Sequence, residues 1–123
     1  ELADPERATF ILDANGTVVG YATLHRGVRS DGIIGEHPTE IQRIYVDRGY
    51  QGKGYAKSLM NACVAQAQRW KSDVLWLAVW EHNPRAIRFY EKSAFYKVGM
   101  QHFQLGSDLQ HDHVMARNLS ASR

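Results

Sequence analysis

The stretch that decides the fold is Ile44-Tyr45-Val46-Asp47-Arg48-Gly49-Tyr50-Gln51-Gly52-Lys53-Gly54-Tyr55-Ala56, which joins a strand to a helix. Residues 40–46 alternate in polarity and predict a strand, and apolar residues recur at helical spacing from 55 to 70. A helix that starts after a glycine loop exposes unpaired backbone N–H groups at the positive end of its dipole. An anion such as phosphate can bind there, because glycine has no Cβ to block its approach.

On this loop alone, a phosphate site and a plain strand-to-helix turn are equally supported. Two known phosphate motifs are excluded. A dinucleotide loop needs a third glycine where Lys57 stands, and a Walker A loop needs Ser or Thr directly after Gly52-Lys53, where Gly54 stands. The pattern present is Gln51-x-x-Gly54-x-Ala56, with Lys53 and Lys57 adding positive charge.

The elements on either side predict a mixed α/β sheet. Strands are expected at residues 8–12 and 17–24, joined by an Asn15-Gly16 hairpin turn, and a loop at 25–39. After the helix come a buried strand at 74–80, a second helix at 84–93 opened by Asn83-Pro84, and strands at about 95–105 and 113–119 around a polar loop, 106–112. The strand–helix–strand crossover predicts parallel pairing at the centre of an α+β sheet, and the hairpins predict antiparallel flanks.

Composition favours one soluble domain spanning residues 1–123. The chain is 44% hydrophobic and 23% charged, and its net charge of +2 is too small to indicate nucleic acid or an anionic membrane as a partner. One cysteine, Cys63, excludes an internal disulfide framework, and no apolar run is long enough to span a membrane. We therefore expect a cytoplasmic protein, and homodimerisation stays open.

Two motifs together resemble the GNAT superfamily of N-acetyltransferases. Gln51-x-x-Gly54-x-Ala56 is similar to the family's Q/R-x-x-G-x-G/A signature, and Ile44-Tyr45-Val46 to the strand end before it. Residues 83–95, Asn-Pro-Arg-Ala-Ile-Arg-Phe-Tyr-Glu-Lys-Ser-Ala-Phe, resemble its N-x-x-A-x-x-F-Y-x-x-x-G-F helix, with Ala94 in place of the glycine. The order of elements matches from about residue 8 onward. The family's first strand and two helices, which commonly border the acceptor site, have no counterpart in this sequence.

The resemblance implies that the donor is acetyl-CoA. Backbone amides of the loop would hold its pyrophosphate, the strand end would pair with its pantetheine arm, Asn83 would bind the arm from the other side, and Lys92 would meet the nucleotide phosphates. The implied donor-site residues are Ile44, Tyr45, Val46, Gln51, Gly52, Lys53, Gly54, Tyr55, Ala56, Asn83 and Lys92.

Acetyl transfer to an amine requires a base, a polarised carbonyl and a proton for the thiolate. The resemblance implies that Tyr90 is the general acid and that Glu40 is the base, directly or through water, with Glu81 in reserve. The alternative interpretations are a core aromatic residue for Tyr90 and a solvated strand-end carboxylate for Glu40. The backbone N–H of Tyr45 or Val46 would polarise the carbonyl.

The acceptor is expected to be a small-molecule primary amine. The segments Glu-Ile-x-Arg-Ile-Tyr-Val (40–46) and Asp112-His113-Val114-Met115 are similar to segments of bacterial polyamine acetyltransferases. Amino acids, antibiotic amines and protein N-termini or lysines stay open as alternative acceptors. The loops at 25–39 and 106–112 would set the acceptor end through four acidic side chains: Asp31, Glu36, Asp108 and Asp112. The alternative class is an acyl-CoA-binding module without catalysis.

Two other features have simple structural interpretations. Cys63 lies on the apolar face of the first helix and is expected to be an inert core residue. His111 and His113 are close in sequence, but there is no second ligand cluster at zinc spacing, so no metal is expected.

Overall fold

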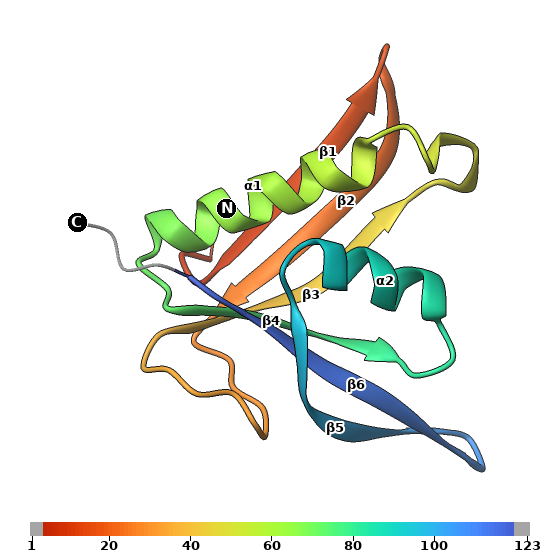
Figure 1. Cartoon of the computed structure of the whole chain (residues 1–123). Helices are drawn as coiled ribbons and strands as arrows, with labels where there is room; N and C mark the ends of the chain where they lie inside the picture. Colours follow the sequence, from red (N-terminus) through yellow and green to blue (C-terminus); the bar gives the residue numbers. More distant parts are fainter. Residues whose placement is uncertain (1–3, 120–123) are drawn as a thin grey trace.

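The computed structural model describes residues 4–119 as a six-stranded sheet with two α-helices on one face (Figure 1). The elements run in the order β1 (Arg7–Ala14), β2 (Thr17–Arg26), β3 (Pro38–Val46), a 3-10 turn (Arg48–Tyr50), α1 (Tyr55–Arg69), β4 (Val74–Trp80), α2 (Pro84–Lys92), β5 (Tyr96–Leu105) and β6 (Asp108–Asn118). The predicted order of strands and helices is confirmed.

The sheet order is β1-β2-β3-β4-β6-β5, and every neighbouring pair is antiparallel except β3 with β4. The predicted first hairpin forms at Asn15 and Gly16, whose φ angles are 54° and 87°. The parallel pairing of β3 with β4 is short, running only from Pro38–Val74 to Glu40–Trp76. Beyond that point each of the two strands pairs only with its antiparallel neighbour, β2 or β6.

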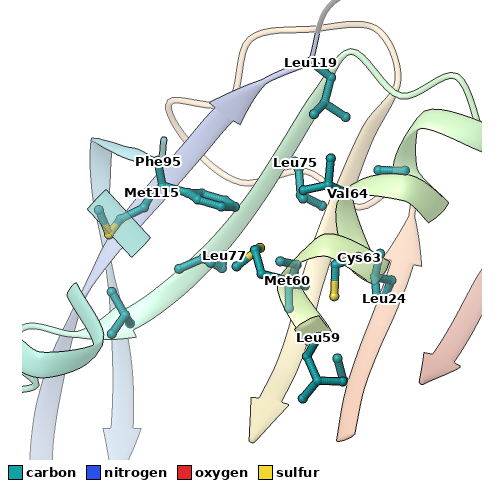
Figure 2. Close-up of a cluster of buried hydrophobic side chains, with 14 of the residues drawn as sticks. Leu24, Leu59, Met60, Cys63, Val64, Leu75, Leu77, Phe95, Met115 and Leu119 are labelled. Atoms are coloured by element: carbon teal, nitrogen blue, oxygen red, sulfur yellow. The ribbon is translucent and has the colours of Figure 1, made fainter. Parts of the chain in front are cut away.

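The main core lies between the helices and the sheet. Figure 2 shows Leu59, Met60, Cys63 and Val64 of α1 among the strand side chains Leu24, Leu75 and Leu77. The opposite face carries a smaller cluster under the loop at 27–37, where Ile33 packs on Trp76 and the indole Nε1 of Trp76 donates to the carbonyl of Val28 at 2.8 Å. The two faces follow the alternation of β4, which is buried on both sides as the sequence predicts.

One predicted boundary is wrong. Residues 106–112 do not form a long loop, because β6 begins at Asp108 and pairs with β5 as far as Asp108–Leu105. The turn is short, with Gly106 at a φ of 60°. The polar sequence here reflects an exposed hairpin end rather than the absence of strand structure.

Ala94 has a φ of 71°, as its alignment with the family's glycine predicts. An alanine in this conformation costs on the order of 1 kcal/mol. The residue precedes Phe95, which is 3% exposed in the main core, so burial of the phenylalanine offsets that cost.

Candidate active site

A cleft of about 750 Å³ opens where β3 ends and α1 begins. It brings together the ends of β3, the glycine loop, the first turn of α1 and one side of α2. The residues that line it are Ile44, Tyr45, Val46, Gln51, Gly52, Gly54, Ala56, Lys57, Asn83, Arg85, Ala86, Phe89 and Tyr90.

The glycine loop adopts a conformation that requires glycine at two positions. Gly52 and Gly54 have φ angles of 78° and 85°, and a Cβ added to either would meet nothing within 4 Å. The space in front of them is therefore open, and it leads to the start of α1, where Gly54 caps the helix without a side-chain hydrogen bond. Gln51 ties the loop to β3, because its Nε2 donates to the carbonyl of Val46 at 3.0 Å. This geometry leaves the first-turn N–H groups available to an anion.

A second cavity, of about 330 Å³, lies in the gap where β3 and β4 separate. It shares Ile44, Tyr45, Asn83, Ala86 and Tyr90 with the cleft, so the two spaces adjoin. Its other lining residues are Tyr21, Ile41, Gln42, Arg43, Leu77, Ala78, Val79 and Trp80. A molecule in the cleft and a second one in the gap would meet beside the five shared residues.

Tyr90 projects from α2 between these two spaces. Its ring packs against Phe89 and Phe95, with centroids 5.5 and 6.0 Å away. Burial, with a smaller contribution from nearby Cys63, raises the pKa of Tyr90 to about 12. The hydroxyl of Tyr90 has no hydrogen-bond partner within residues 4–119. Every fully buried side-chain oxygen or nitrogen in that range does have a partner, so this hydroxyl is not fully buried. The hydroxyl is therefore open to the cavity and protonated at neutral pH.

Asn83 performs the capping role that its position before Pro84 predicts. Its Oδ1 accepts a hydrogen bond from the backbone N–H of Ala86 at 3.2 Å. The side chain also lines both the cleft and the gap, and its Nδ2 remains a donor toward them.

Neither candidate base lines these cavities. Glu40 is half-buried at the foot of the gap, where it pairs in register with His25 and Trp76. Burial raises the pKa of Glu40, although a hydrogen bond with Gln42 and the charges of His25 and Arg7 oppose the shift. Glu81 lies beyond the end of β4, with its Oε2 3.5 Å from the Nε2 of His82.

The remaining predicted residues divide between the site and its surroundings. Lys53, Tyr55 and Lys92 line neither space, although Tyr55 helps to fix the loop by packing against Tyr50 at 6.0 Å between centroids. The four acidic side chains expected at the acceptor end also lie outside the gap. Asp112 pairs in register with Trp80, which lines the gap, but its Oδ1 accepts a hydrogen bond from Gln110 at 2.8 Å.

Sequence reasoning did not single out Arg85, Ala86 and Phe89 as site residues. The signal that could have found them is helical periodicity: positions 85, 86, 89 and 90 lie on one face of α2. If Tyr90 faces the donor, the residues one turn before it face the donor too.

Cys63 is fully buried, as expected, and burial raises its thiol pKa to about 12, so it is not a reactive thiolate. Within residues 4–119, no group of three or more His, Cys, Asp or Glu side chains is arranged to hold a metal ion. None of the helices in that range is long and apolar enough to cross a membrane.

Comparison with known proteins identifies the family. The model of the acetyltransferase (GNAT) family matches residues 1–95. The chain belongs to the GNAT acetyltransferase family. An uncharacterized N-acetyltransferase of Mycobacterium tuberculosis is 39% identical to this GNAT protein over 118 residues, which are 96% of this chain and 71% of the relative.

Two further comparisons show how far the likeness extends. The Escherichia coli ribosomal-protein-S18-alanine N-acetyltransferase has the same fold, with a TM-score of 0.77 over 98% of this chain and 74% of that one at 22% identity. The spermine/spermidine N(1)-acetyltransferase of Bacillus subtilis is 34% identical over 56 residues, 45% of this chain and 37% of the relative. The resemblance predicted from the two motifs is confirmed, and the protein is an N-acetyltransferase of this family.

Proposed function

We propose that this GNAT protein transfers the acetyl group of acetyl-CoA directly to the primary amine of a small molecule. The observation that carries the proposal is that Tyr90 lines both the cleft at the start of α1 and the gap between β3 and β4. A donor in the cleft and an amine in the gap meet beside its hydroxyl, so no acyl-enzyme is needed.

The cleft suits the donor's chemistry. First-turn N–H groups of α1 bind the pyrophosphate, and Lys57 and Arg85 add positive charge at the same place. The edge of Ile44–Val46 that faces away from β2 has no strand from residues 4–119 beside it, because β3 and β4 have already separated. Its backbone groups hydrogen-bond the pantetheine arm as an added strand would.

The transfer balances with groups on this chain. The amine nitrogen bonds to the thioester carbonyl carbon, whose oxygen accepts a hydrogen bond from the backbone N–H of Tyr45 or Val46. As the carbon–sulfur bond breaks, Tyr90 gives its proton to the departing sulfur, and the attacking nitrogen, which is positively charged after attack, returns a proton to the Tyr90 oxygen as it becomes the amide nitrogen. Glu40 removes the proton of the ammonium group through water, since its carboxylate lies at the foot of the gap and not in its lining.

The lining of the gap discriminates among amines. Its lining residues include three aromatic residues, Tyr21, Tyr45 and Trp80, and one basic residue, Arg43, but no Asp or Glu from residues 4–119. An amine on a neutral, aromatic or anionic body fits this lining. A polyamine fits less well, because its additional cations would face Arg43 without a compensating charge.

A thiol-release assay tests the proposal. Acetyl-CoA is incubated with a panel of primary alkylamines that contains one amine on an aromatic body, the same amine with an added carboxylate, and spermidine. We expect amine-dependent thiol release that favours the first two. CoA binding without thiol release for any amine would instead identify a non-catalytic acyl-CoA-binding module, and a preference for spermidine would restore the polyamine as the acceptor.

A further inference from the structure

A separate cavity of about 390 Å³ lies at the end of α1 that is far from the donor cleft. All of its ionisable lining residues are basic: it is formed by Arg26, His37, Arg69, Trp70 and Lys71. These residues come from the end of β2, the approach to β3 and the end of α1. The 15 residues of α1 span about 22 Å, and the cavity shares no residue with the cleft.

Arg26 is held in place from two sides. Its Nη2 donates to the carbonyl of Trp70 at 3.3 Å, and its guanidinium carbon lies 5.2 Å from the centroid of the Trp70 ring. A guanidinium has five N–H donors, so others remain for a ligand after this contact and the long 3.8 Å ion pair with Glu6. Because the guanidinium of Arg26 is already oriented by these contacts, its side chain loses little conformational entropy when a ligand binds.

Among the described residues, the carboxylates beside this cavity are those of Glu6, Glu36 and Asp73, and Asp73 already accepts hydrogen bonds from the backbone N–H groups of Glu36 and His37 at 2.8 and 3.1 Å. Arg69 donates only to the neutral amide oxygen of Gln66, at 2.7 Å, and Lys71 has no ion pair among the described residues. Glu36 contacts His37 at 4.0 Å, but its side chain is 91% exposed. The helix dipole favours cations at this end and accounts for Arg69 and Lys71. It does not account for Arg26 and His37, which converge on the same space from other elements.

We propose that this cavity binds a small phosphorylated metabolite through its phosphate monoester group. Three permanent cations that approach from two directions match a compact dianion with several acceptor oxygens better than a single carboxylate. The volume accommodates a phosphate and a small organic body, whose carbon chain would lie against Trp70. The ligand would bind independently of acetyl-CoA, since the two sites are separated by the length of α1.

The test uses glycerol 3-phosphate as the probe, at fixed ionic strength and with saturating CoA so that the donor cleft is filled. We expect saturable changes in the NMR signals of Trp70 and Lys71. In the variant Arg69→Gln/Lys71→Gln the dissociation constant should rise at least tenfold. The control variant Arg88→Gln/Lys97→Gln removes two exposed charges elsewhere and should stay within twofold of the parent.

Three results would overturn the proposal. One is an absence of saturable change at Trp70 and Lys71 in the parent protein. The second is equal affinity in the two double variants, which would mean attraction by net charge alone. The third is tighter binding of inorganic phosphate than of glycerol 3-phosphate, which would assign the cavity to the free ion. Retained acetyl-CoA turnover in the Arg69→Gln/Lys71→Gln variant shows that it is folded.

Discussion

Replacing Tyr90 by phenylalanine removes the hydroxyl on which the proposed chemistry depends and leaves the packing in place. The ring contacts with Phe89 and Phe95 are the same for phenylalanine. The hydroxyl opens to the cavity and has no hydrogen-bond partner within residues 4–119. The free energy of unfolding should therefore change by less than about 0.5 kcal/mol.

The effect on turnover follows from the pKa of the phenol. At about 12, this pKa keeps the proton in place at neutral pH. A free thiol titrates near 8.5, so complete transfer to the thiolate before bond cleavage would be uphill by about 5 kcal/mol. The proton must move as the carbon–sulfur bond breaks. Loss of a positioned acid of this kind lowers kcat by about 10²-fold, or about 2.7 kcal/mol of activation free energy.

Single-turnover acetylation measures this effect without the contribution of product release. We expect the dissociation constant for acetyl-CoA to stay within about twofold and the rate of the chemical step to fall about 10²-fold. An acetyl thioester of a more acidic thiol should reduce the difference in rate between the parent and Tyr90→Phe, because its thiolate leaves without needing a proton from an acid. An unchanged single-turnover rate would refute the assignment and leave Tyr90 as a packing residue.

Three more variants test the other parts of the site. Gly54→Val should abolish CoA binding in calorimetry, because a β-branched residue at a φ of 85° strains the turn and blocks the phosphate. Lys53→Ala should weaken CoA binding only moderately. Equal CoA affinity in Gly54→Val and the parent would exclude the loop as the phosphate site. Glu40 works as a base only when ionised, so its raised pKa predicts that kcat/KM falls as pH drops through a value above 4.5. In Glu40→Gln this fall at low pH should disappear, and activity should rise toward high pH, where the amine is already deprotonated. An unaltered pH profile would rule Glu40 out. Asn83→Ala should lower the free energy of unfolding by about 1 kcal/mol in denaturant titration, because the cap to Ala86 is lost, and it should also raise the KM for acetyl-CoA. Asn83→Asp keeps the cap, so it should have normal stability and a raised KM. A normal KM in Asn83→Asp would exclude the Asn83 amide as a hydrogen-bond donor to the substrate.

The parts of the site that sequence could predict are those set by local rules. The glycine loop and the cap at Asn83 each follow from a few adjacent residues, whereas the positive φ of Ala94 follows from the resemblance to the family's helix motif, and all three are found in the structure. The start of β6 could not be read in this way, because its polar residues are held in a strand by pairing with β5. The distance of Glu40 from the gap also depends on the register between strands that are far apart in sequence.

The gap between β3 and β4 shows why the geometry of the candidate site depends on such long-range pairing. The antiparallel ladder with β2 holds β3 as far as Val46–Gly20, and β6 holds β4 as far as Trp80–Asp112. Gly20 permits the first of these, since a Cβ there would stand 2.6 Å from the carbonyl oxygen of Tyr45. β3 and β4 are therefore parallel neighbours for only three residues and then separate, because each follows a different antiparallel partner. Tyr90 of α2 lies against the opening between them. The space that we propose for the amine comes from the way the strands are paired, and the local motifs supply residues that line it.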